Sequence, residues 1–300
     1  MVSNTIAKQD ILHISRMLEN NKFEAEKMYE ILQHYKDSLP LVRYLLDPRF
    51  IIYRASINNE CQLHNTVDRL SYPPAKFART DRASLEGKPM FYGTILTSAI
   101  KKNAYPYIVG TLETTDILRN YEAKGIVHNT ISLWKMNRPL KLFAFPFSDK
   151  YSRPTAEIIT QIQGWKEKMS ESDYKGSSLF SKYIGDLIAT QNYSCLYDIT
   201  ARTIDYILYE SSVASSLDGV MYPSVMAAGE GMNICLKKET VDNCLKFERA
   251  ILQQVYKFEG RAIVVPLAYS YFAPDRNTIA WVPSKLSMQS LLSGEFFTIK

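Results

Sequence analysis

Residues 218–236 read DGVMYPSVMAAGEGMNICL, and two short apolar runs in this stretch are separated by residues that favour turns. Gly219 after Asp218 and Pro223 before Ser224 both carry turn chemistry. We therefore expect two strands, GVMYPSV and MNICLKK, with the hydroxyl of Ser224 at the end of the first. Ser224 either caps a strand end as an ordinary polar residue or turns its hydroxyl toward a ligand.

The composition is that of an ordinary globular protein. The chain has 300 residues, 46% of them hydrophobic and 22% charged, which is enough to bury a sizeable core. No apolar run approaches the roughly 20 residues that span a membrane. The N-terminal MVSNTIAKQDILHIS lacks the basic start and apolar core of a signal peptide. We therefore expect a cytoplasmic protein with no membrane segment.

The charge and the metal-ligating residue types argue against a nucleic-acid-binding site and against a metal site. The formal net charge is +5, and the Lys and Arg residues form no dense block of the kind that binds nucleic acid. The four cysteines include no C-x-x-C pair and the four histidines are isolated. These features predict reduced structural thiols, no metal site and no direct contact with nucleic acid.

The apolar periodicity changes along the chain and predicts an α+β fold. Residues 4–46 have helical spacing with a break at the Asn pair 20–21, and strands begin near residue 50. Helices return after residue 155, and strands dominate again from residue 219. We expect a helical N-terminal extension at residues 1–47, a catalytic domain at 48–250, and a strand-rich C-terminal tail at 251–300 packed on the core.

Familiar catalytic signatures are missing, so the candidate site residues are single residues beside predicted strands and helices. There is no G-x-S-x-G, no Gly-Lys-Ser/Thr phosphate loop, no H-E-x-x-H and no G-x-G-x-x-G, and GEG at 229–231 reads as a turn. Arg54 ends an apolar run, where it is either a surface residue or a bidentate phosphate ligand. Tyr92, on a strand that runs into a Gly turn, is either a core tyrosine or a pocket wall.

Glu113 follows an apolar run in IVGTLETTDILR, where a helix is expected from about Thr114. Its ordinary interpretation is a carboxylate that is favoured by the positive end of the helix dipole. Its functional interpretation is a pocket carboxylate that stabilises a developing positive charge. The spacing alone does not distinguish these two interpretations of Glu113.

Five segments in order resemble the RES-domain family, which is named for its characteristic Arg, Glu and Ser: YRAS, LSYPPAKFARTDRASLEGKPMFYGT, LETTDILR, ISLWKMNRPLKLFAF and DGVMYPSVMAAGEGMNICLKKETVD. The resemblance covers about residues 48–250. In compact members the Glu comes soon after the aromatic strand, where this chain has Lys101 and Lys102. Longer members match LETTDILR, which puts the family Glu at Glu113.

The resemblance implies an ADP-ribosyltransferase-like mixed sheet that acts on NAD. Family members are typically toxins of bacterial toxin–antitoxin pairs, which degrade NAD by phosphorolysis or hydrolysis, or transfer ADP-ribose to a protein. By this resemblance Arg54 holds the NAD phosphates and Tyr92 packs on the nicotinamide. Glu113 binds the nicotinamide ribose and stabilises its oxocarbenium-like transition state, and Ser224 hydrogen-bonds the ligand.

Arg79 and Arg82, in the loop before the aromatic strand, are expected on the side of the adenosine or of an incoming phosphate. Because nicotinamide departs neutral, one carboxylate that stabilises the ribose cation suffices, and no metal is needed. We expect an NAD phosphorylase or glycohydrolase. The alternatives are a protein mono-ADP-ribosyltransferase and a catalytically inactive nucleotide-binding module. The expected partners are NAD, inorganic phosphate and, carried over from the family, a helix-turn-helix antitoxin.

Overall fold

The computed structural model describes residues 2–59, 62–95, 106–145, 156–190, 194–224, 232–258, 261–272, 277–284 and 296–298. The helices are α1 (Asn4–Glu19), α2 (Ala25–His34), α3 (Pro106–Thr114), α4 (Asp116–Arg119), α5 (Ala156–Lys168), α6 (Glu171–Ile188), α7 (Ser194–Asp205) and α8 (Lys238–Cys244). Short helical turns cover Val67–Leu70, Ala75–Phe77, Tyr206–Glu210 and Ala214–Ser216. The strands are β1 (Val42–Leu46), β2 (Ile52–Asn58), β3 (Met90–Ile95), β4 (Gly125–Met136), β5 (Leu140–Ala144), β6 (Gly219–Pro223), β7 (Met232–Lys237), β8 (Leu245–Phe258), β9 (Arg261–Phe272), β10 (Ile279–Pro283) and β11 (Phe296–Thr298).

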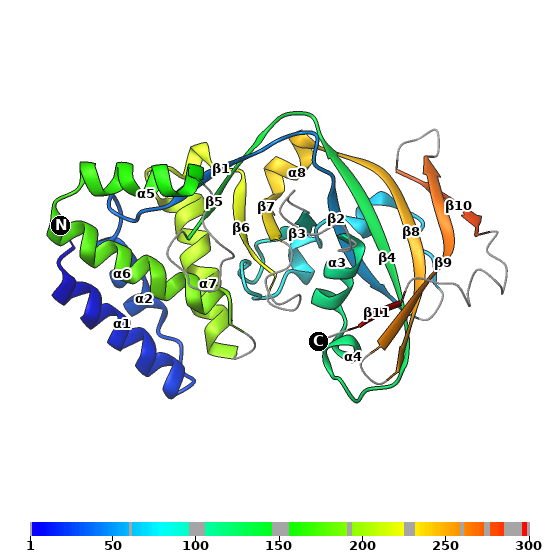
Figure 1. Ribbon diagram of the computed structural model, residues 1–300, viewed down its shortest axis with the longest axis horizontal. Helices are drawn as coiled ribbons and strands as arrows, with labels where there is room; N and C mark the ends of the chain where they lie inside the picture. The colour runs from blue at the N-terminus through cyan, green and yellow to red at the C-terminus, as the bar shows by residue number, and fades with distance from the viewer. Residues whose placement is uncertain are drawn as a thin grey trace.

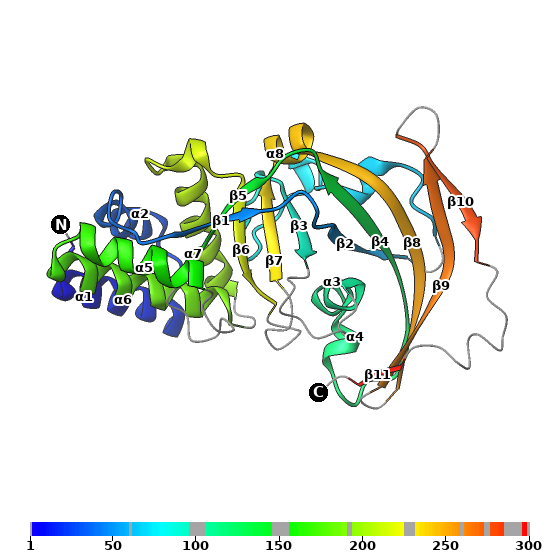
Figure 2. The same ribbon diagram turned by 45° about the horizontal axis from the view of Figure 1, so that its top comes forward.

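All the strands belong to one mixed sheet, which confirms the predicted α+β class. The order is β1-β5-β6-β7-β3-β2-β4-β8-β9-β10, and β11 pairs with β9. Strands β5 and β6 run parallel, whereas β6 and β7 run antiparallel. In Figures 1 and 2, most helices gather beside the β1–β7 end of the sheet, and the long strands β4, β8 and β9 curve away at the other end.

The sheet is weakly joined at its centre. Strand β3 pairs with β7 over six positions, from Met90 to Ile95. It pairs with β2 at a single position, Tyr53 opposite Thr94. Helix α3 contacts β2, β3 and β4, and Figure 2 shows it in the hollow of the curved sheet. The two halves of the sheet therefore diverge beside α3, and this divergence leaves room for a cavity.

The N-terminal helices share their core with the middle of the chain. Ile14 of α1 and Met28 of α2 are fully buried in one cluster with Phe180 of α6. The two helices are separated by Asn21, whose φ of 48° lies in the left-handed region that Asn tolerates better than most residues. Gly176 of α6 lies so close to the start of the chain that a Cβ there would overlap the carbonyl oxygen of Val2. The segment is thus part of the main core.

Alternation along the strands divides the core into two layers. Val220 and Tyr222 of β6 face the cluster that holds α1, α2, α6 and α7. Met221, between them, faces a second cluster on the other side of the sheet, with Phe91 and Trp134. Successive residues of a strand point to opposite faces, so a short apolar run such as GVMYP fits a strand that is buried on both sides.

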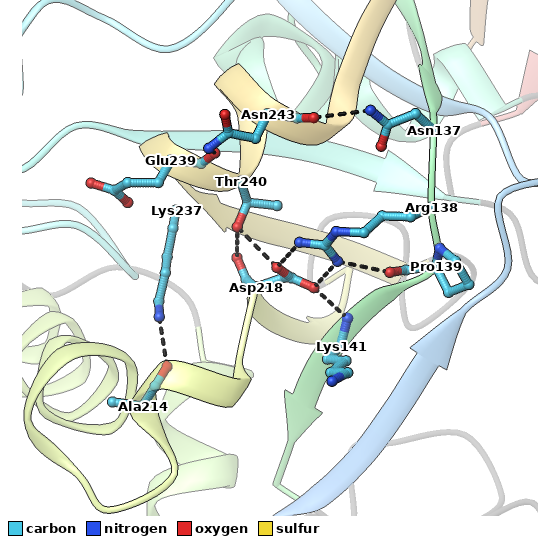
Figure 3. A network of polar contacts seen from close by, with 10 residues as sticks. All are labelled: Asn137, Arg138, Pro139, Lys141, Ala214, Asp218, Lys237, Glu239, Thr240 and Asn243. Atoms are coloured by element: carbon cyan, nitrogen blue, oxygen red, sulfur yellow. Dashed lines mark hydrogen bonds and ion pairs between the residues drawn. The ribbon is translucent and has the colours of Figure 1, made fainter.

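Asp218 fixes the start of β6 (Figure 3). Its carboxylate accepts two hydrogen bonds of 2.8 Å from Arg138 and one of 2.7 Å from the backbone N–H of Lys141. Thr240 of α8 donates to the same carboxylate at 3.2 Å. The backbone N–H of Asp218 donates back to the Lys141 carbonyl at 2.8 Å. The Asp218–Gly219 pair therefore joins β6 to β5 and α8, where sequence reasoning saw only a turn.

Three expectations about the elements are wrong. The helical reading of residues 4–46 fails at its end, because Val42–Leu46 forms β1 and pairs with β5. The boundary predicted between residues 250 and 251 falls inside β8, which pairs with β4 along its length, so no separate tail begins there. The residues before Thr114, which read as strand or loop, form α3 from Pro106 to Thr114, and the helix expected after them is the short α4, Asp116–Arg119. Within the described residues, no helix is long and apolar enough to cross a membrane.

Candidate functional site

A cavity of about 360 Å³ opens where β2 and β3 diverge. Its walls come from β2, β3, α3, α7, β6, β7 and the loop before β3. The volume lies within the roughly 300–1,000 Å³ typical of small-molecule sites. Four of the predicted site residues line this one cavity: Arg54, Arg82, Tyr92 and Glu113.

Glu113 lies in the last turn of α3, at the negative end of the helix dipole, so the dipole does not favour its carboxylate. Hydrogen bonds hold it instead. Its Oε1 accepts one hydrogen bond of 2.5 Å from the Ser224 hydroxyl and one of 2.9 Å from the Asn233 side-chain amide. Asn233 in turn accepts a hydrogen bond of 3.3 Å from the Thr94 hydroxyl. The carboxylate is thus fixed by β7 and by the end of β6.

Ser224 is the residue that directly follows β6, as the sequence predicted. It is fully buried, and its hydroxyl points to Glu113. The hydroxyl therefore contacts the carboxylate that lines the cavity. Direct hydrogen bonding of Ser224 to a ligand stays a prediction.

Arg54 lies inside β2 instead of at its end, and it places a half-buried positive charge beside the cavity. Its Nη1 donates a hydrogen bond of 2.8 Å to the carbonyl of Tyr92, and its guanidinium carbon lies 5.2 Å from the Phe91 ring centroid. Its Nε is buried and has no hydrogen-bond partner among the residues that the structure describes. Burial lowers the pKa of Arg54 to about 10, so the side chain remains charged at neutral pH.

Tyr92 connects the sheet to the loop before it. Its hydroxyl accepts a hydrogen bond of 3.0 Å from the backbone N–H of Ala83 and donates one of 3.1 Å to the Ser84 hydroxyl. Burial raises the pKa of Tyr92 well above its usual value, and the charge of Asp81 raises it further. Gly93 continues strand β3, so the turn expected after Tyr92 is absent.

Arg82 is buried between two tyrosine rings. Its guanidinium carbon lies 5.6 Å from the Tyr197 ring centroid and 5.9 Å from that of Tyr222. Its Nη1 donates to the carbonyl of Ile188, at the end of α6, and to that of Thr190 at 3.2 Å. Burial by itself lowers the pKa of Arg82, but the neighbouring tyrosines and Glu113 outweigh it and raise the pKa overall.

Arg79 lies apart from the residues above. Its side chain is exposed and does not line the cavity, and its backbone carbonyl accepts a hydrogen bond of 3.2 Å from the Ser84 hydroxyl. The structure therefore brings Arg54, Arg82, Tyr92 and Glu113 together and leaves Arg79 on the surface. Lys101, Lys102 and the GEG segment at 229–231 lie outside the described residues.

Sequence reasoning did not single out four further residues at the cavity: Asp81, Tyr197, Tyr222 and Asn233. Two of them lie in residues 218–236. Tyr222 precedes the Pro-Ser pair, and Asn233 is the polar residue of the following strand. Tyr197 lies in α7 with no local pattern that sets it apart from a core tyrosine.

The described residues contain no group of three or more His, Cys, Asp or Glu side chains that could hold a metal ion. The chemistry that the described part of the cavity offers comes from two guanidinium groups, two carboxylates, tyrosine rings, threonine hydroxyls and the amide of Asn233. In comparisons with known proteins, no family model matches the chain and no curated protein matches it either.

Proposed function

We propose that the chain is an NAD-consuming enzyme, which breaks the N-glycosidic bond between nicotinamide and ribose on an ADP-ribosyltransferase-like fold. The proposal rests on the resemblance to the RES-domain family and on one observation. Residues from separate segments that carry that resemblance line a single cavity. Surface or core residues with no common role would have no reason to converge in this way.

Glu113 has the setting that this reaction requires. As the bond to nicotinamide breaks, positive charge develops on the ribose, and a carboxylate held in place stabilises it without reorganisation. Ser224 and Asn233 hold one oxygen of Glu113 at 2.5 Å and 2.9 Å. A carboxylate anchored by two donors is positioned in advance of the reaction.

Arg54 has the setting of a phosphate ligand. A buried guanidinium N–H with no partner is costly in a folded protein and calls for an explanation. The Nε of Arg54 is such a group among the described residues, on a side chain that lines the cavity. An anionic oxygen of the NAD diphosphate would pair with it. Tyr92 supplies an aromatic ring at the same cavity for the nicotinamide.

The test is nicotinamide release from NAD by the purified protein, measured by chromatography. Glu113→Gln keeps an oxygen that can accept from Ser224 and Asn233, but it removes the charge. We expect this variant to lose at least about 100-fold in kcat with an unchanged thermal midpoint. The matched control is Glu122→Gln, at an exposed glutamate, which should retain full activity.

Further experiments separate the alternatives. NAD that binds in calorimetry without turnover by the wild-type chain would mean a nucleotide-binding module. Transfer of labelled ADP-ribose to a protein band in a lysate would mean a protein ADP-ribosyltransferase. Normal turnover by Glu113→Gln would refute the assignment of the carboxylate. Growth arrest of bacteria on expression of the wild type, but not of Glu113→Gln, would support the role of a toxin that the resemblance suggests.

A further inference from the structure

A second carboxylate belongs to the cavity. Asp81 lines the cavity together with Glu113, and its side chain is exposed. Its Oδ1 accepts a hydrogen bond of 2.7 Å from the backbone N–H of Arg82. Its own N–H donates to the Ser84 carbonyl at 2.9 Å, which closes a tight turn. Asp81 therefore stands on the solvent side of the site in a defined backbone position.

The turn that carries Asp81 is fastened to the sheet. Ala83 and Ser84 are both buried. The backbone N–H of Ala83 donates a hydrogen bond to the Tyr92 hydroxyl, which in turn donates one to the Ser84 hydroxyl. Arg82 is anchored to the carbonyls of Ile188, the last residue of α6, and of Thr190. The anchored neighbours and the hydrogen bond from the Arg82 N–H therefore position the Asp81 carboxylate, as a group that acts on a reacting molecule requires.

The two carboxylates line the same cavity, and Tyr222 lines it with them. Burial raises the pKa of Tyr222 well above its usual value, and the charges of Glu113 and Asp81 each raise it further. Stabilising the ribose cation needs only one carboxylate, so the second is left for another task.

Two positive charges line the described part of the cavity, and each guanidinium donates hydrogen bonds to backbone carbonyls. In the described part of the chain, Arg54 and Arg82 are the only cationic side chains that line it. The Nη1 of Arg82 donates hydrogen bonds to two backbone carbonyls. Arg54 is the proposed ligand of the NAD diphosphate. Arg79, the other candidate for an incoming phosphate, lies outside the cavity. A phosphate that approached past Asp81 would meet the repulsion of that carboxylate, whereas neutral water carries no such penalty.

We propose that Asp81 is the general base that activates water, so that the enzyme is a hydrolase and not a phosphorylase. This inference rests on the function proposed above. The bond from the ribose carbon to the nicotinamide nitrogen breaks, and its electron pair stays with nicotinamide, which leaves neutral. The Asp81 carboxylate takes a proton from water as the water oxygen bonds to the same ribose carbon. NAD⁺ and water give ADP-ribose, nicotinamide and one proton, which Asp81 releases to solvent.

Asp81→Asn tests the charge without removing the turn, because the amide oxygen can still accept from the Arg82 N–H. We expect kcat for nicotinamide release to fall about 100- to 10,000-fold, with little change in KM for NAD. The control is Asp68→Asn, an exposed aspartate that does not line the cavity. A purely structural Asp81 would leave kcat of a folded Asp81→Asn protein unchanged, and that result would overturn the inference.

Two further measurements separate this inference from the function on which it rests. With inorganic phosphate present, the wild type should still yield free ADP-ribose; ADP-ribose 1″-phosphate as the main product would overturn the inference and leave NAD cleavage standing. Formate should restore part of the activity of Asp81→Ala, because it supplies the missing base, and failure to do so would count against a general base. If the wild type releases no nicotinamide at all, the proposed function itself fails.

Discussion

Replacing Asp218 with alanine tests whether the start of β6 depends on its carboxylate. The side chain of Asp218 is 11% exposed, whereas that of its partner Arg138 is 47% exposed. Asp218 also accepts a hydrogen bond of 2.7 Å from the backbone N–H of Lys141 and one of 3.2 Å from the Thr240 hydroxyl. The substitution removes all of these acceptors at once.

The expected loss follows from the burial of each partner. The ion pair with Arg138 contributes about 1 kcal/mol, because half of the arginine side chain remains in water. The Lys141 N–H loses its acceptor, which costs about 1–3 kcal/mol. We therefore expect Asp218→Ala to lower the free energy of unfolding by about 3 kcal/mol. Arg138→Ala should cost only about 1 kcal/mol, because Asp218 keeps the Lys141 and Thr240 hydrogen bonds.

Urea unfolding followed by circular dichroism measures these differences, with Glu30→Ala as a control. Glu30 pairs with Lys27 on the exposed face of α2, and its loss should change stability by less than about 0.5 kcal/mol. Equal effects of Asp218→Ala and Arg138→Ala would refute the reasoning, because the ion pair alone would then account for the loss. A loss below about 1 kcal/mol for Asp218→Ala would refute it as well.

The effect should also depend on pH. Burial by itself raises the pKa of Asp218, but the hydrogen bonds from Arg138 and Lys141 outweigh it and lower the pKa below its usual value. A carboxylate whose folded pKa is lowered contributes stability above its unfolded pKa of about 3.9, and the contribution disappears as pH falls through the folded value. The difference between the wild type and Asp218→Asn should therefore be largest at neutral pH and shrink below about pH 4.

Gly219→Ala should give little folded protein, because a Cβ there overlaps the carbonyl oxygen of Cys235; a normal soluble yield and thermal midpoint would contradict this. Asn233→Ala removes one of the donors to Glu113 and should lower kcat for nicotinamide release about tenfold or more, whereas an unchanged kcat would mean that Asn233 does not position the carboxylate. Arg54→Lys replaces a planar fork with a point charge and should raise KM for NAD about tenfold; an unchanged KM would argue against a phosphate contact.

The local sequence pattern was sufficient to predict most of the helices and strands. The helical periodicity of α1 and α2, the Asn pair between them and the strands around residues 219–237 all follow from the order of apolar and turn-forming residues. The misassigned segments are those in which local preference was overridden. Val42–Leu46 continues a helical stretch in sequence but becomes β1, because β5 offers it a partner.

The position of Glu113 shows a different limit. Residues before Thr114 resemble a strand or loop in sequence, yet α3 runs from Pro106 to Thr114 against β2, β3 and β4. Tertiary packing can outweigh the weak propensities of a short segment. The carboxylate consequently lies at the end of a helix instead of its beginning.

By itself, the sequence determined the residue types of the site and the strand order along the chain that carries them. Only the tertiary structure decided which of them meet. Arg79 and Arg82 stand three positions apart in one loop, yet the first is exposed and the second is buried between tyrosines. Ser224 lies 111 residues from the carboxylate to which it donates. Such contacts depend on where β2 and β3 diverge, which is a property of strand pairing across the whole sheet and leaves no local trace.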